Sequence, residues 1–305
     1  AIMGTRAIAD RRERFLTIML APYMSCAARL PVYILLIAAF VPATGYLGGW
    51  LQLQALVMLA MYLVGVVVAI PLAWVMKRTL LAGPAGGFVL ELPSYKVPRP
   101  RAIWQRMYDG GRSFVVRAGT IILIVNVLMW ALAYFPRSTT TRDAVMAQAA
   151  AAGWDDETTD SELAGAYLRS SYLGRMGHAI EPVLAPLDWD WKIGVAVIAS
   201  FPAREVIVAT LGTLFNLGGE QDEESEPLRA ALQQATRDDG RPLFTLPVAL
   251  SIMVFFALCA QCVSTLVVIG RETGSWGYPV LSFVSMTLIA YGAAWAVGAV
   301  ARLWV

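Results

Sequence analysis

The chain has 305 residues, of which 58% are hydrophobic and 15% charged, with a mean hydropathy of +0.60 and a formal net charge of +2. Because soluble domains carry about 25% charged residues, this composition predicts an integral membrane protein and argues against a secreted disulfide scaffold, a nucleic-acid binder and a disordered chain. Three cysteines and one histidine cannot form a disulfide framework or a histidine-rich metal site. No GxxxxGK[ST] run occurs, so we expect no nucleotide-binding P-loop and no enzymatic activity in this chain.

Six apolar stretches are long enough to cross a bilayer, since a membrane helix needs about 20 apolar residues. They cover residues 30–48, 52–76, 115–135, 192–216, 245–269 and 278–301. Several of them contain no charged residue, whereas a buried helix of a soluble protein would show a polar face. We therefore expect an all-α membrane protein, a polytopic helical bundle with about six spans.

The segments between the spans differ in charge. Residues 77–117 carry eight basic and two acidic side chains, a net charge of +6, and residues 1–22 are also basic. Residues 136–191 carry four arginines and nine acids, a net charge of −5. The positive-inside rule places the first two segments in the cytoplasm and the third outside, and six crossings then put both ends of the chain in the cytoplasm. The acidic segment 218–242 would also be cytoplasmic, which is in mild tension with its charge.

A short motif occurs twice. Residues 25–32 resemble residues 200–207, with Ser, Ala and Arg recurring at the same spacing. Three predicted crossings separate the copies, so the second would be inverted, and inverted repeats with broken helices are typical of transporters. Chance similarity is the alternative. The chain then divides into a first gate repeat (1–135, an amphipathic lead-in segment and three spans), an extramembrane, partly helical cap (136–190) and a second gate repeat (191–305).

Two charged residues lie near the middle of the fourth span. Arg204 and Glu205 would each cost about 2.5–3.5 kcal/mol to insert at the centre of a membrane helix. Pro202, just before them, lacks an N–H and would break the helix, which exposes backbone carbonyls that can bind cations. Either these residues belong to a permeation pathway or the Arg–Glu pair locks two helices together.

Two cysteines have polar neighbours that make them candidate ligands. Pro22 and Pro31 bracket Ser25 and Cys26, which would point into an unwound stretch, although a packing role for Cys26 is equally compatible with its surroundings. Polar side chains also surround a cysteine late in the fifth span, namely Gln261, Cys262 and Ser264. Cys259 and His178 fit packing and surface roles. Thiols with a carboxylate and several oxygens suit Fe²⁺ or Zn²⁺ better than Mg²⁺ or Ca²⁺, so the predicted chemistry is passage of a cation.

At these residues the chain resembles the membrane half of the ferrous iron transport protein B (FeoB) family. The most specific match is Pro22–Tyr33, which is close to the first gate motif of the family. Ala203–Val206 resembles the family's Ala-Lys-Glu-Val, with Arg204 in place of the lysine. Cys262–Thr265 and Arg271–Trp276 resemble its late cysteine segment and Arg-Glu-Thr-Gly-Ser-Trp run, although Gln261 stands where the family often has proline.

The resemblance implies uptake of Fe²⁺ across the bacterial inner (plasma) membrane, with Cys26, Cys262 and Glu205 as ligands or gate residues. Ser25, Gln261 and Ser264 would assist them. The remaining motif residues would shape the gates: Arg29, Pro31, Ser200, Pro202 and Arg204. GTP and Mg²⁺ would bind only to a cytoplasmic G domain outside this chain.

The expected partners are membrane lipid, the G domain, a small cytoplasmic accessory protein and a second copy of the chain, with no nucleic acid. Two alternatives stay open. One is a gate-type transporter of another divalent metal or of a nucleoside, and the other is a non-transporting membrane subunit.

Overall fold

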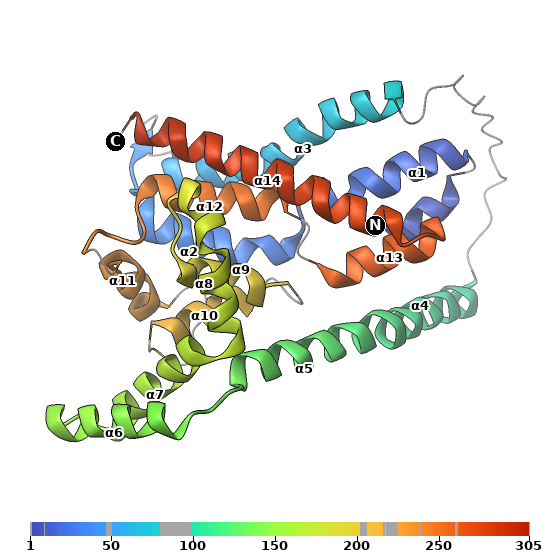
Figure 1. Cartoon of the computed structure of the whole chain (residues 1–305). Helices are drawn as coiled ribbons and strands as arrows, with labels where there is room; N and C mark the ends of the chain where they lie inside the picture. The colour runs from blue at the N-terminus through green and yellow to red at the C-terminus, as the bar shows by residue number, and fades with distance from the viewer. Residues whose placement is uncertain are drawn as a thin grey trace.

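The computed structural model describes residues 2–8, 10–46, 51–79, 99–201, 206–215, 217, 225–237, 240–259 and 262–304. Helices dominate it (Figure 1), and the described strands form one antiparallel pair, β1 (Gly45–Tyr46) and β2 (Leu51–Gln52). The first α-helices are α1 (Arg11–Leu20), α2 (Leu30–Phe40), α3 (Leu53–Thr79), α4 (Pro100–Phe114), α5 (Thr120–Tyr134), α6 (Thr139–Ala152) and α7 (Asp156–Ser170). They are followed by α8 (Tyr172–Leu184), α9 (Trp191–Ala199), α10 (Val206–Leu214), α11 (Glu226–Gln234), α12 (Leu246–Leu258), α13 (Val263–Thr273) and α14 (Gly277–Arg302).

Short turns of tighter or wider helix join several of these elements. The 3₁₀ turns are η1 (Ile2–Ala7), η2 (Ala21–Tyr23), η3 (Ala27–Arg29) and η6 (Ala185–Leu187). A π-helical turn, η5 (Val115–Gly119), connects α4 to α5, so the predicted span at 115–135 continues upstream as one long rod (Figure 1).

Four stretches of the described residues are long and apolar enough to cross a membrane: Arg11–Phe40, Leu53–Thr79, Leu246–Thr273 and Gly277–Arg302. Leu123–Tyr134 forms a shorter apolar helix. The prediction of an all-α, polytopic membrane protein is confirmed. The apolar spans themselves explain the fold class, because a helix satisfies every backbone hydrogen bond within one segment, as lipid demands.

The chain from α1 to α2 runs antiparallel to α3 over its whole length. Gln54, at the start of α3, donates from Nε2 to the carbonyl oxygen of Val41 just after α2, at 3.0 Å. Met76, near the end of α3, packs with Ile18 of α1. The first crossing therefore extends from Arg11 to Phe40, and the predicted span at 30–48 is wrong in its bounds because α2 ends at Phe40.

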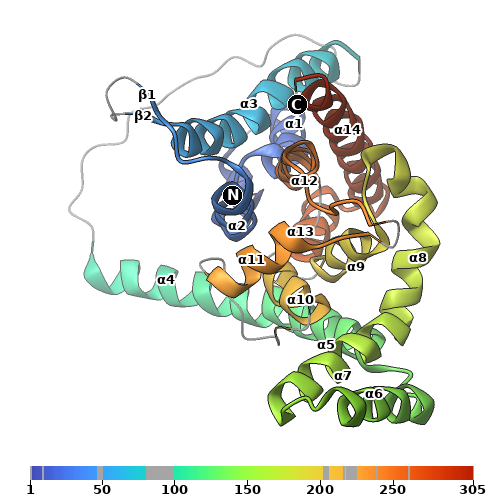
Figure 2. The ribbon, with the colours of Figure 1, turned by 90° about the vertical axis from the view of Figure 1, so that its left-hand side faces the viewer.

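The chain turns back on itself between α9 and α10. Lys192, at the start of α9, has its Nζ 6.0 Å from the ring centre of Phe215, which follows α10. Asp188, before α9, pairs through Oδ1 with Nη1 of Arg237, beyond α11, at 2.7 Å. α11 packs against α2 (Figure 2). The start of α9 and the end of α10 thus lie close together, and the predicted crossing at 192–216 is instead a helical hairpin.

The hairpin reaches deep into the bundle. Trp189 donates from Nε1 to Ser251 Oγ at 2.7 Å, and Ser251 lies against Gly298 of α14. At the other end of α9, the ring of Phe201 meets that of Phe283 at 5.7 Å. Gly298 and Phe283 are 15 positions apart on α14, or about 22 Å along its axis. The hairpin therefore penetrates more than half the depth of a membrane-spanning α14.

The two ends of the chain lie at opposite ends of α14 (Figure 1). Phe15 of α1 meets Tyr278, in the first turn of α14, edge-on at 4.7 Å between ring centres. α14 has 26 residues, which is about 39 Å of helix before the chain reaches Leu303. If α14 crosses the membrane, the ends face opposite sides. This differs from the predicted arrangement because the 192–216 segment returns instead of crossing.

Residues 136–190, the predicted cap, contain α6, α7 and α8. Gly153 ends α6 in a left-handed conformation with φ 65°. Asp155 caps α7 by accepting a hydrogen bond from the backbone N–H of Thr158, and the bonds to Thr158 lower the pKa of its carboxyl. α8 packs closely on α9 because Gly177 has no side chain, and an added Cβ would lie 2.4 Å from Val195 Cγ2. This close contact holds the hairpin against α8.

Candidate functional site

The first break is the stretch Met24–Cys26 between η2 and η3, where Met24 and Cys26 adopt extended backbone conformations. Ser25 donates from Oγ to the carbonyl oxygen of Tyr62 in α3 at 3.4 Å, and Cys26 is exposed. Gly65 allows this approach, because an added Cβ there would lie 2.5 Å from the Tyr23 carbonyl oxygen. Gly65 is the thirteenth of the 27 residues of α3, so the first break lies at its mid-length.

A buried arginine holds the first break in shape. Only 1% of Arg29 is exposed, and its Nη2 and Nη1 lie 3.2 and 3.5 Å from the carbonyl oxygens of Pro22 and Tyr23. These carbonyls follow α1 and have lost their helical partners, so the guanidinium satisfies groups that the break leaves open. Pro31 occupies the first turn of α2, where a missing N–H costs nothing.

The second break lies between the end of α9 at Ala199 and the start of α10 at Val206. Ser200 ends α9, is fully buried, and donates from Oγ to the carbonyl oxygen of Val197 at 2.7 Å. Pro202, Arg204 and Glu205 lie outside the described residues. The end of α9 at Ala199 and the start of α10 at Val206 nevertheless bracket them with two helix termini.

The third break is the stretch 259–262 between α12 and α13. Cys259 is buried, and Cys262 is half-buried and precedes the first residue of α13. The Sγ of Cys262 lies 2.8 Å from Ser264 Oγ. Gln261 lies outside the described residues. The helix is thus interrupted within the predicted span 245–269, even though no proline stands there.

The predicted site residues are therefore distributed over three breaks. The structure brings Ser25 and Cys26 together, and likewise Cys262 and Ser264. Among the described residues there is no group of three or more His, Cys, Asp or Glu side chains that could hold a metal ion. His178 is exposed on α8 and stacks on Trp191 at 4.4 Å between ring centres, which fits the predicted surface role.

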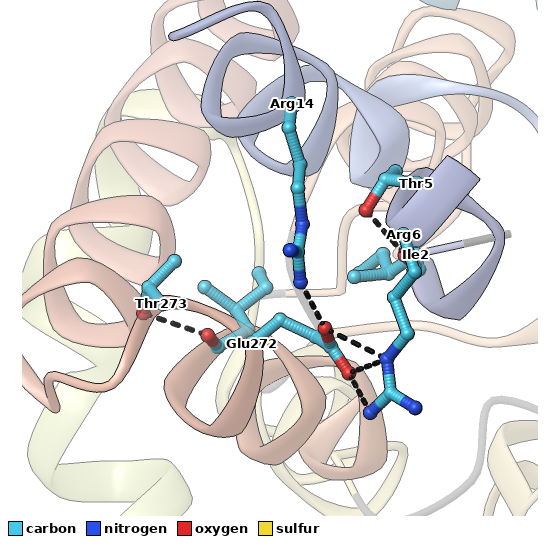
Figure 3. Close-up of polar contacts among 7 residues, drawn as sticks. Ile2, Thr5, Arg6, Arg14, Glu272 and Thr273 are labelled. Carbon is cyan, nitrogen blue, oxygen red and sulfur yellow. Dashed lines mark hydrogen bonds and ion pairs between the residues drawn. The ribbon is translucent and has the colours of Figure 1, made fainter. Parts of the chain in front are cut away.

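An ion cluster near the end of α13 was not predicted. Glu272 accepts hydrogen bonds from Nε and Nη2 of Arg6 and from Nη2 of Arg14 (Figure 3). This contact raises the pKa of the Arg6 guanidinium. The sequence carried one signal, the charged pair Arg271-Glu272 directly after the uncharged run that ends at Gly270, together with Arg6 and Arg14 near the beginning of the chain.

The chain matches two known protein families. Residues 115–276, more than half of the chain, match the Gate family, described as nucleoside recognition, and residues 58–109 match the FeoB_C family, described as ferrous iron transport protein B C terminus. The chain belongs to the Gate family, as a membrane region of the FeoB type. The predicted resemblance is confirmed.

Curated FeoB relatives match the chain from end to end. An Fe(2+) transporter FeoB of Leptospira interrogans is 36% identical over 304 residues, which cover all of this chain and 41% of the relative. That of Leptospira biflexa is 37% identical over 95% of this chain and 39% of the relative. A Porphyromonas gingivalis fusion of Fe(2+) transport protein A with FeoB is 33% identical over 95% of this chain. The chain thus spans about two fifths of the first two relatives, and no solved structure matches it.

Proposed function

We propose that this chain forms the membrane pathway of a ferrous iron uptake transporter. One observation carries the proposal: two cysteines lie at helix breaks. Cys26 lies at the first break, beside the middle of α3, and Cys262 lies at the third break, between α12 and α13. Relatives named Fe(2+) transporter support the cargo. Because the chain spans only part of those relatives, the transport activity itself is the proposal.

The donor atoms at the breaks suit Fe²⁺. Thiol sulfur at Cys26 and Cys262, with hydroxyl oxygen at Ser25 and Ser264, makes a mixed set that favours Fe²⁺ or Zn²⁺ over Mg²⁺. From the sequence we assign Glu205 and Gln261 as further oxygen donors. The shape of the breaks would be held by Arg29, Pro31, Ser200, Pro202 and Arg204.

We further propose a bacterial inner-membrane location with the lead-in segment in the cytoplasm. The hairpin returns the acidic segment 218–242 to the side of the acidic segment 136–191, which removes the tension with the charge pattern. The C-terminal end then lies outside, instead of in the cytoplasm as the six-span reading had it.

Partners follow from the same proposal. GTP and Mg²⁺ would act on a cytoplasmic G domain that is not in this chain. The fused Porphyromonas gingivalis relative supports a small accessory protein of the Fe(2+) transport protein A type. Lipid would surround the exposed apolar side chains of α3, α5 and α14. A homo-oligomer stays a prediction.

The nucleoside alternative finds less support. A nucleoside site needs aromatic stacking and polar groups for the base and sugar. Among the described residues, a cavity bordered by α2, α9, α10 and α12 measures about 20 Å³, and its lining is apolar: Val32, Leu35, Leu36, Ile193, Ala196, Ile207, Leu211, Phe244, Ile252 and Phe256. Such a space holds neither a nucleoside nor a hydrated cation.

Uptake of ⁵⁵Fe²⁺ under reducing conditions, into vesicles that contain this chain with and without a supplied G domain, tests the proposal. We expect Cys26→Ser and Cys262→Ser each to lower uptake by about tenfold or more, since even indirect perturbation of a metal ligand costs that much. Cys259→Ala is the matched control and should transport normally. Full uptake by the double Cys26/Cys262 variant, or competition by a nucleoside but not by Zn²⁺ or Mn²⁺, would overturn the assignment.

A further inference from the structure

Glu272 lies between two arginines that cover its carboxylate. Only 4% of its side chain is exposed, and its carboxylate lies 2.5–3.1 Å from nitrogen atoms of Arg6 and 2.6 Å from Nη2 of Arg14 (Figure 3). Charge-assisted bonds of this kind are about twice as strong as neutral ones. Removing one partner leaves the carboxylate with fewer of its charge-assisted bonds, which weakens the link between the segments that carry them.

Two residues of this cluster, Arg14 and Glu272, belong to the helices that adjoin the thiol-bearing breaks. Arg14 is on α1, which ends at Leu20, six residues before Cys26. Glu272 is in the last turn of α13, whose first residue follows Cys262. Whatever fixes α1 against α13 therefore also fixes the first break against the third.

Apolar packing makes the same connection. Ile269, one turn before Glu272, is fully buried and clusters with Ile18 and Met19 of α1, Met76 of α3 and Ile2 of η1. The lead-in turn η1, α1, the end of α3 and the end of α13 thus form one packed unit. The Glu272 cluster adds directional bonds to contacts that by themselves would permit sliding.

The two arginines are not equivalent. The Arg14 side chain is 31% exposed and forms one bond, whereas the Arg6 side chain is 57% exposed and forms three, from a turn at the beginning of the chain. A movement of η1 (Ile2–Ala7) can therefore break the Arg6–Glu272 contact, whereas Arg14 is held within the bundle by α1.

We propose that Glu272 is a positioning residue. Through Arg14 it fixes the position of the first break relative to the third, and through Arg6 it couples both breaks to η1 (Ile2–Ala7). The inference rests on the proposed function for its significance, but its geometry does not depend on which cation passes. A shift of residues 2–7 would alter the setting of Cys26 and Cys262 without any change at the breaks themselves.

The test measures thiol reactivity in the full chain, reconstituted in vesicles, using variants that keep only Cys26 or only Cys262. Glu272→Gln and Arg14→Gln should change the maleimide labelling rate of both thiols by about tenfold, equivalent to about 1.4 kcal/mol in local opening. Arg6→Gln should change the rates in the same direction but less. Arg11→Gln, an exposed arginine of the same helix, is the matched control and should leave the rates unchanged.

Two further measurements separate positioning from stability. Labelling is compared well below the melting temperature of each variant, and the exchange Arg14→Glu with Glu272→Arg should restore the rates at least in part. Unchanged labelling in Glu272→Gln and Arg6→Gln would overturn the inference, even if the melting temperature falls. If the parent chain showed no Cys-dependent uptake, that result would count against the proposed function and would leave the labelling result intact.

Discussion

Two stretches with similar motifs, 11–40 and 191–214, follow different paths through the molecule. In the first, the helix breaks at Ser25–Cys26, and α2 then continues alongside α3 toward the other end of that helix. In the second, α9 ends at Ala199 and α10 brings the chain back, so that Lys192 meets Phe215. Similar motifs therefore occur in a stretch that passes through and in one that returns, so the motif does not decide the path of the chain.

Contacts with distant segments decide the path. After the first break, Gln54 and Val41 tie the end of α2 to the start of α3. After the second, the Arg237–Asp188 pair ties the segment beyond α11 to the start of α9. These partners are far apart in the sequence or follow the motif by many residues, so inspection of the motif alone cannot reveal them.

The largest expected effect is on sidedness. Single cysteines at Arg11, Gln148, Gln234 and Leu303, in a chain without its native cysteines, would be labelled with a membrane-impermeant maleimide. With a hairpin at 191–214, positions 148, 234 and 303 react from one side and position 11 from the other. With six crossings, positions 11, 234 and 303 would react together and position 148 alone from the opposite side, which would remove the difference between the two stretches.

Gly65→Ala tests the first path. An added Cβ would lie 2.5 Å from the Tyr23 carbonyl oxygen, so the first break and α3 must separate. Overpacking of this kind costs about 1–3 kcal/mol. Thermal unfolding in detergent should show the loss, together with a changed labelling rate at Cys26. Gly292→Ala in α14, where nothing lies within 4 Å, is the control and should be neutral or slightly stabilising. A neutral Gly65→Ala would mean that the first break does not rest on α3.

The sequence predicted the long spans well and the hairpin not at all. Residues 52–76 and 278–301 correspond to Leu53–Thr79 and Gly277–Arg302, because sustained hydropathy is sufficient evidence for one crossing. The stretch 192–216 is equally apolar and long. Hydropathy cannot distinguish one helix that crosses from two half-helices that return, since both place the same number of apolar residues in lipid.

The site was predicted in part for a similar reason. Prolines near Cys26 indicated the first break, and both of them occupy starts of helical turns. The third break lacks such a signal, because Cys259 and Cys262 leave the helix through extended backbone without a proline. The Glu272 cluster joins residues up to 266 positions apart, so only the folded chain shows it.

The smallest expected effect concerns the closure of the hairpin. The side chains of Arg237 and Asp188 are 18% and 37% exposed, and a partly exposed pair contributes about 0.2–1 kcal/mol. Asp188→Asn is a mild variant, because asparagine tolerates the left-handed backbone that Asp188 adopts, with φ 64°. A double-mutant cycle with Arg237→Gln, read by thermal unfolding, should give a coupling energy in that range.

The control is the more exposed Arg169–Glu162 pair of α7, with 3.8 Å between its charged atoms, which should show almost no coupling. If the Arg237–Asp188 coupling were equally small, the pair would not stabilise the hairpin. The difference between the two paths would then rest on packing, with Gly177 of α8 against Val195 of α9 as its main contact. Gly177→Ala should in that case destabilise the protein more than both members of the ion pair together.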